Sequence, residues 1–88
     1  MIKQTVTISN KLGLHARPSA QITQAASRFA AEVWLSKSGR RVNAKSIMGV
    51  ITLGATFNTE LKIIANGPDE AKAVDAIEKL FNNRFEEE

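Results

Sequence analysis

Apolar and polar residues alternate along three stretches of the chain, at residues 2–8, 31–36 and 61–65. A period of two is typical of strands with one buried face, so each stretch predicts a strand. Residues 37–40, with the sequence Lys-Ser-Gly-Arg, then predict a turn into a fourth strand over residues 41–44. The strands at residues 31–36 and 41–44 together form a predicted hairpin.

A longer spacing of apolar residues predicts the first helix, which begins near Ala16 and has about three turns. Its apolar residues recur three or four positions apart and so share one helix face: Pro18, Ile22, Ala26 and Phe29. The polar residues between them are expected outside this face: Ser19, Gln21 and Gln24.

Two further helices are predicted from their ends. Ser46 is a typical N-cap for a short helix over residues 47–53, and Gly54 is a typical residue just past a helix end. Asp69 is the expected cap of the last helix. The apolar face of that helix contains four residues: Ala73, Ile77, Leu80 and Phe81. The helix is expected to fray into Glu86-Glu87-Glu88.

The elements follow the order β-α-β-β-α-β-α over residues 1–88, without repeats or linkers. In a chain of this length, half-buried strands and amphipathic helices must share one core. The sequence therefore predicts a single α+β domain of two layers, a four-stranded antiparallel sheet with helices on one face. Trp34 is expected on the uncovered face. Pattern alone leaves the strand order open, because split βαβ motifs give similar element strings.

Composition excludes several classes of site. The chain has no cysteine, which removes disulfides, thiolate nucleophiles and cysteine-based metal sites. No apolar run reaches membrane-spanning length and the first residues contain no apolar signal core, so we expect a cytoplasmic protein.

Charge is distributed unevenly along the chain. Residues 1–45 carry eight Lys and Arg and one acidic residue, Glu32, whereas residues 46–88 carry four Lys and Arg and eight acidic residues. A basic half can face nucleic acid, an anionic membrane or an acidic protein surface.

His15 is the only histidine of the chain, and it stands at the start of the first predicted helix. The unpaired backbone N–H groups of a first turn and the positive end of the helix dipole stabilise anions. The Arg17 guanidinium is a further anion partner, and Pro18 is well tolerated in a first turn. The stretch therefore suits a phosphoryl group on His15. The competing interpretation is that His15 is only a polar helix cap and Arg17 a solvated side chain.

Two motifs carry a resemblance that extends over the whole chain. Gly13-Leu14-His15-Ala16-Arg17-Pro18, followed by Lys45-Ser46-Ile47-Met48-Gly49-Val50 and Leu53-Gly54, resembles the histidine-containing phosphocarrier family HPr of the bacterial phosphoenolpyruvate-dependent phosphotransferase system. The resemblance implies an open-faced sandwich with strand order 1-4-2-3 and three helices on one face. It also implies transfer of a phosphoryl group from enzyme I to Nδ1 of His15 and on to enzyme IIA proteins. The carrier itself turns over no free substrate, and we expect neither a cofactor nor a metal.

The site that this resemblance implies has several parts. His15 is the phosphoryl acceptor, Arg17 the phosphate partner, and the backbone N–H groups of Ala16 and Arg17 the anion donors. Ser46 is a regulatory phosphorylation site for an HPr kinase/phosphorylase. The candidate docking residues are an apolar patch with basic neighbours beside His15: Leu14, Arg17, Lys45, Ile47 and Met48. The competing interpretation is that the three apolar residues belong to the core. We expect a monomer whose partners are proteins, not nucleic acids or membranes.

Two alternatives stay open at this point. A small nucleic-acid-binding α+β domain would use the basic residues Lys37, Arg40, Arg41 and Lys45. Against it, no strand carries an RNP-type aromatic pair and no GXXG loop is present. The other alternative is a regulatory domain that binds a small anion non-covalently at the same helix end.

Overall fold

Four strands form one antiparallel sheet in the computed structural model, which describes residues 1–87. They are β1 (Ile2–Thr7), β2 (Glu32–Lys37), β3 (Arg40–Asn43) and β4 (Glu60–Asn66). The order across the sheet is β1-β4-β2-β3. Each strand therefore pairs antiparallel with its neighbours, and the expected order 1-4-2-3 is confirmed.

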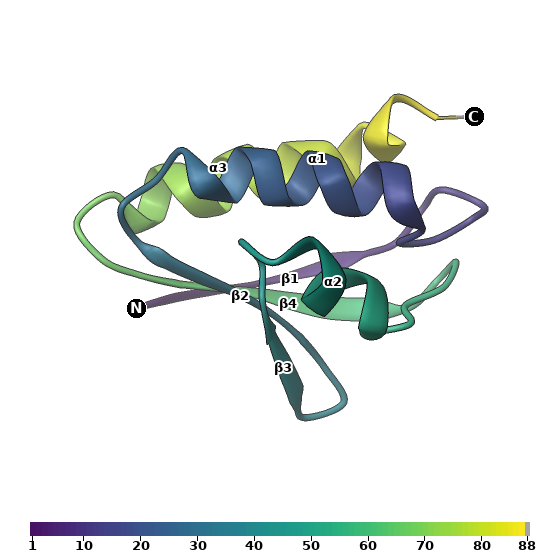
Figure 1. Cartoon of the computed structure of the whole chain (residues 1–88), viewed down its shortest axis with the longest axis horizontal. Helices are drawn as coiled ribbons and strands as arrows, with labels where there is room; N and C mark the ends of the chain where they lie inside the picture. Colours follow the sequence, from purple (N-terminus) through teal and green to yellow (C-terminus); the bar gives the residue numbers. More distant parts are fainter. Residues whose placement is uncertain (88) are drawn as a thin grey trace.

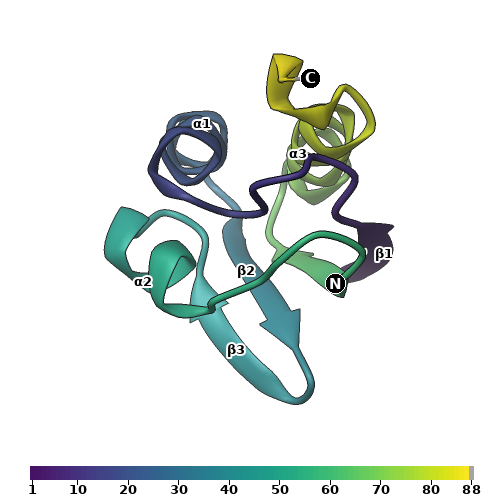
Figure 2. The same ribbon diagram turned by 90° about the vertical axis from the view of Figure 1, so that its right-hand side faces the viewer.

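The helices form the second layer on one face of the sheet (Figures 1 and 2). They are α1 (Ala16–Ser27), α2 (Ile47–Thr52) and α3 (Glu70–Asn82), and a short 3-10 turn η1 (Arg84–Glu86) follows α3. Helices α1 and α3 lie side by side above the sheet, and α2 lies next to α1 near β3 (Figure 2). The predicted α+β sandwich is confirmed.

The core lies between the two layers, where the strand and helix patterns place their apolar residues. Fully buried side chains from both layers fill it: Ile8, Ile22, Leu35, Leu61, Ile63, Ile77, Phe81 and Phe85. Burial of each large side chain contributes about 1.5–3 kcal/mol to the free energy of unfolding. The rings of Phe81 and Phe85 meet edge to face with 5.0 Å between their centroids, which links the last helix to the end of the chain.

Two predicted exposed positions are in fact buried. Ser19, expected outside the apolar face of α1, is fully buried, and its hydroxyl donates to the carbonyl of Leu14 at 3.1 Å. Ile64, which alternation places on the same strand face as Glu60 and Lys62, is only 5% exposed. It lies opposite Trp34 in the sheet, and the Arg41 guanidinium stacks over the indole at 4.3 Å from the ring centroid. Trp34 and Lys3 flank Ile64 in the sheet, on the strands on either side of β4.

The turn before α1 packs closely against the segment that follows α2. Gly13 has a φ of +67°, and a Cβ atom at this position would lie 2.5 Å from the carbonyl oxygen of Ala55. The Leu14 N–H donates to the same oxygen at 3.0 Å. Glycine is required here by both its conformation and the close approach. This contact fixes the point at which the chain enters α1.

Asp69 occupies the N-cap position of α3, as predicted, but its side chain makes no capping hydrogen bond. Instead its carboxylate accepts from the N–H groups of Ala30 at 2.9 Å and Ala31 at 2.8 Å, just before β2. These backbone hydrogen bonds, first that of Ala30, lower the pKa of Asp69 below its usual value. Glu70 accepts from the N–H of Gly67 at 3.0 Å. Asp69 therefore connects α3 to the segment between α1 and β2.

Substitution Asp69→Asn should lower the free energy of unfolding at neutral pH, because the neutral amide cannot replace a carboxylate that accepts two backbone bonds. Since the folded-state pKa is lowered, the stabilisation is present above the unfolded value of about 3.9 and is lost as pH falls through the folded pKa. Urea unfolding from pH 7 to pH 3 should show the difference between wild type and variant shrinking with acid. Asp75→Asn, at an exposed pair with Lys79, is the control. A constant difference across this range would contradict the prediction.

Substitution Gly13→Ala should destabilise the fold by about 2–5 kcal/mol, since it adds left-handed strain to overpacking against Ala55. Gly39→Ala is a matched control, because Gly39 also has a positive φ of +82° but has open space where its Cβ would lie. Its cost should be limited to about 1–2 kcal/mol of conformational strain. Urea unfolding measures both values. Equal losses for the two variants would show that the close contact at Gly13 is unimportant.

Candidate functional site

His15 is the N-cap residue of α1, as the sequence predicts. Its backbone is extended, with φ −76° and ψ −169°, and its carbonyl accepts the first helical hydrogen bond from the Ser19 N–H at 3.1 Å. Its side chain makes no capping hydrogen bond and remains 36% exposed. The interpretation of His15 as a side-chain helix cap is therefore wrong, and the imidazole is accessible at the helix start.

The first turn of α1 leaves two backbone donors near this ring. The N–H groups of Ala16 and Arg17 precede the first helical donor, Ser19, so they have no acceptor within the helix. Pro18 has no N–H to leave unpaired. Both Ala16 and Arg17 are exposed. The sequence prediction of two N–H donors and one guanidinium next to His15 on the chain fits this geometry.

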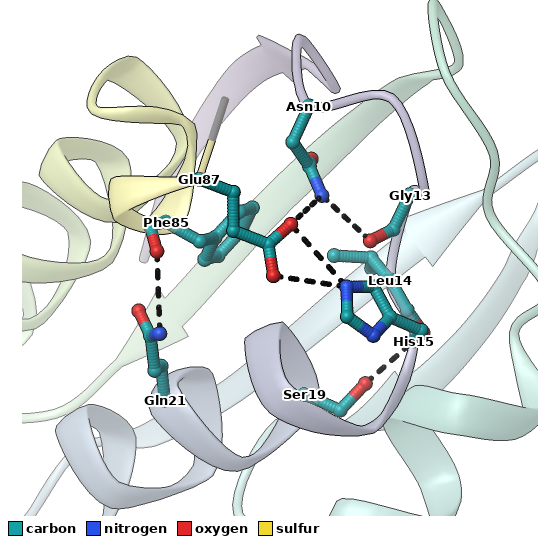
Figure 3. A network of polar contacts seen from close by, with 8 residues as sticks. All are labelled: Asn10, Gly13, Leu14, His15, Ser19, Gln21, Phe85 and Glu87. Carbon is teal, nitrogen blue, oxygen red and sulfur yellow. Dashed lines mark hydrogen bonds and ion pairs between the residues drawn. The ribbon is translucent and has the colours of Figure 1, made fainter.

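A carboxylate that the sequence analysis did not assign to the site contacts the His15 ring (Figure 3). Glu87 places Oε2 at 3.0 Å and Oε1 at 3.3 Å from Nε2 of His15. The amide of Asn10, which is fully buried, donates to Glu87 Oε1 at 3.1 Å and to the Gly13 carbonyl at 2.8 Å. The loop before α1 and the end of the chain thus meet at the histidine.

The Glu87 side chain is only 15% exposed, and opposing effects act on its protonation. Burial by itself raises the pKa of a carboxyl group, but the hydrogen bonds from His15 and Asn10, with the charges of His15 and Arg17, outweigh it. The net result is a pKa of Glu87 below its usual value. Glu87 is therefore an ionised hydrogen-bond acceptor at neutral pH.

Residues 84–87 are held against α1 and α3, so the expected fraying at Glu86-Glu87 is wrong; Glu88 lies outside the described residues. Phe85 is fully buried, and its carbonyl accepts from Gln21 of α1 at 3.3 Å. All three residues of η1 have positive φ, between 52° and 59°. Glu87 follows this left-handed turn, and its side chain points towards His15 (Figure 3).

Ser46 is the N-cap of α2, as predicted, and its hydroxyl accepts from the Gly49 N–H at 3.2 Å. Beside it, Ile47 is 38% and Met48 63% exposed, which confirms the expected exposure of both. Leu14 is only 4% exposed and belongs to the core. The expectation of an exposed Leu14 is wrong, because the turn at Gly13 directs this side chain inward.

Lys45 does not lie beside His15. Its ammonium donates to the Phe29 carbonyl at 2.8 Å, beyond the C-terminal end of α1. A helix of 12 residues spans about 18 Å, so the Lys45 ammonium lies at the opposite end of α1 from His15. The C-terminal end of α2 instead leads to Ala55, whose carbonyl accepts from Leu14.

Three of the four basic residues considered for nucleic-acid binding have contacts within the fold, whereas Arg40 is exposed. Lys37 contacts the carbonyls of Leu53 and Gly54 at the end of α2, at 3.5 and 3.4 Å. Arg41 stacks on Trp34, and Lys45 is bound to Phe29.

Within residues 1–87 there is no group of three metal-ligating side chains, and no helix there is long and apolar enough to cross a bilayer.

Sequence analysis missed Glu87 and Asn10 as parts of the site. Asn10 stands in a polar stretch next to Gly13 that is typical of a turn, and nothing in its neighbourhood shows that its amide reaches Glu87. Glu87 looked like part of a solvated acidic end. The available signal was Phe85, a large apolar residue four positions after Phe81, which continues the apolar face of α3 and indicates that the end of the chain is anchored.

Comparison with known proteins identifies the family. A family model described as the PTS HPr component phosphorylation site matches residues 2–83. The phosphocarrier protein HPr of Treponema pallidum is 52% identical over 88 residues, covering 100% of both chains. That of Cupriavidus necator is 49% identical and covers 99% of this chain and 98% of its own. The crystal structure of HPr-C-His from Thermoanaerobacter tengcongensis has a TM-score of 0.96 and 44% identity, over 100% of this chain and 99% of that one. The chain therefore belongs to the HPr phosphocarrier family of the phosphotransferase system.

Proposed function

We propose that this phosphocarrier accepts a phosphoryl group on Nδ1 of His15 from phospho-enzyme I and passes it to enzyme IIA proteins in the cytoplasm. The proposal rests on the different surroundings of the two ring nitrogens of His15. Nε2 is engaged by Glu87 at 3.0 Å, and the other ring nitrogen points away from that carboxylate (Figure 3). Nδ1 is therefore the nitrogen with a free lone pair.

The proposed transfer needs only groups of the two proteins. The Nδ1 lone pair forms a new N–P bond while the N–P bond to the donor histidine breaks, and its electrons return to that donor ring. The N–H groups of Ala16 and Arg17 and the Arg17 guanidinium stabilise the phosphoryl oxygens. Transfer to enzyme IIA is the same step in the other direction, so the carrier turns over no free substrate.

The exposed residues near the helix pair suit brief docking of several partners. Ile47 and Met48 offer apolar surface, and methionine adapts to different partner shapes. Arg17 contributes positive charge beside His15. Interfaces of a relay must separate quickly, so we infer a total buried area below about 1,200 Å² and steering by charge. His15, Arg17 and Glu87 all come from one chain, so one copy suffices for the site, and a monomer stays our prediction.

We further propose that phosphorylation of Ser46 by an HPr kinase/phosphorylase regulates docking. Phosphoserine would add about −1.5 to −2 charges at the start of a helix, where negative charge is tolerated. Ser46 begins α2, which packs against α1, so the phosphate would act on a partner that covers both α2 and His15. An acidic enzyme I surface would be repelled there.

Incubation of the purified protein with phosphoenolpyruvate, magnesium and enzyme I should add one acid-labile phosphoryl group by intact mass. His15→Ala should show none, because it removes the acceptor nitrogen. Its fold should stay intact, because the His15 side chain is 36% exposed. An HPr from another bacterium, incubated with the same enzyme I preparation, serves as the positive control. No mass addition to the wild-type protein under conditions that phosphorylate the control would contradict the proposed function. Non-covalent phosphate binding alone would favour the anion-binding alternative.

Substitution Ser46→Asp should weaken enzyme I binding by roughly tenfold, or about 1.4 kcal/mol, through charge repulsion. Ser46→Asn is the matched neutral control, since asparagine, like aspartate, is a good N-cap and should keep α2 intact. Surface plasmon resonance at low and high salt measures the affinities, and the loss should shrink at high salt. Unchanged affinity of the aspartate variant, or an equal loss in the asparagine variant, would count against regulation by charge.

A further inference from the structure

The His15 ring has a second polar partner whose position depends on the end of the chain. Glu87 contacts only Nε2 among the ring nitrogens, and its carboxylate is held on its other side by the buried amide of Asn10. Both amide hydrogens of Asn10 are used, one for Glu87 and one for the Gly13 carbonyl. The carboxylate is thus fixed relative to the loop that carries His15.

The backbone conformation of residues 84–86 also fixes the position of Glu87. Three consecutive non-glycine residues, Arg84, Phe85 and Glu86, adopt positive φ, a conformation that side chains disfavour. Such a turn persists only where surrounding packing determines it. Burial of the Phe85 ring against Phe81, and the bond from Gln21 to the Phe85 carbonyl, supply that packing. The contact between Glu87 and His15 is therefore built into the fold.

We propose that Glu87 is a positioning residue for phosphoryl transfer, which holds the His15 ring in the tautomer with the proton on Nε2 and the lone pair on Nδ1. This inference rests on the proposed function of His15. An ionised carboxylate accepts a hydrogen bond from a protonated ring nitrogen, but it cannot donate a hydrogen bond to an unprotonated one. It therefore selects the Nε2–H tautomer and fixes the ring orientation, as second-partner carboxylates of histidine do in other sites.

The same contact stabilises the charge that develops during transfer. When Nδ1 forms the N–P bond, the ring keeps its Nε2 proton and gains positive charge. No proton leaves in this step, and the Glu87 carboxylate faces that charge across the Nε2–H bond. Arg17 and the backbone N–H groups act on the phosphoryl oxygens, whereas Glu87 acts on the ring. When the phosphoryl group moves on, the ring returns to the same neutral tautomer.

The test combines ring NMR with transfer kinetics. In ¹⁵N-labelled wild-type protein, long-range ¹H–¹⁵N correlation of the neutral His15 ring should show a protonated Nε2 and a bare Nδ1. Glu87→Ala should give a mixture of tautomers and slow phosphorylation by enzyme I by roughly tenfold, the effect of losing one charged hydrogen bond. Glu87→Gln can either accept from a protonated Nε2 or donate to a bare one, so it should restore neither the single tautomer nor the full rate. Glu86→Ala removes an exposed neighbouring charge and should change neither.

The outcomes separate this inference from the proposed function. If wild type and Glu87→Ala share the same tautomer ratio and the same rate of phosphorylation, Glu87 does not position His15, although His15 is still the acceptor. If Glu87→Ala and Glu86→Ala slow transfer equally without a tautomer change, only surface charge matters and the inference is again overturned. If the tautomer depends on Glu87 but the wild-type protein accepts no phosphoryl group, the proposed function fails.

Discussion

The close packing of the Gly13 turn against Ala55 is the constraint on which the site depends. It forces the chain into a left-handed turn, buries Leu14, and leaves His15 as the last extended residue before α1. Helix α1 can therefore begin only at Ala16. Two unpaired N–H groups and Arg17 then accompany the ring as a consequence of helix geometry and not of separate adjustment.

A second constraint comes from the other end of the chain. Burial of Phe85 beside Phe81 compensates for a left-handed turn of three residues that would cost about 1–2 kcal/mol per residue in isolation. The turn brings Glu87 to Nε2 of His15. The two nitrogens of the only histidine thus have different environments, one beside a fixed carboxylate and one available for chemistry. This difference is what a nitrogen nucleophile of defined tautomer needs.

Local patterns predicted most of the fold, because strand alternation, helix spacing and caps such as Ser46 are encoded within a few residues. Resemblance to the family added the strand order. The failures concern tertiary contacts. Ser19 is buried and its hydroxyl donates to the Leu14 carbonyl. Ile64 is flanked by Trp34 and Lys3 on the neighbouring strands. The Asp69 carboxylate accepts from two distant N–H groups and makes no capping bond. Glu87 belongs to the same class, since its partners His15 and Asn10 are more than 70 residues away in sequence.

We propose that Nδ1 of His15 carries the phosphoryl group while Nε2 keeps its proton. The most direct measurement is the one-bond coupling between phosphorus and nitrogen in the ¹⁵N-labelled, phosphorylated protein, observed by ³¹P and ¹⁵N NMR. The structure predicts coupling to Nδ1, with Nε2 still protonated. Coupling to Nε2 would contradict the account, because it would require the phosphoryl group to occupy the position where Glu87 lies.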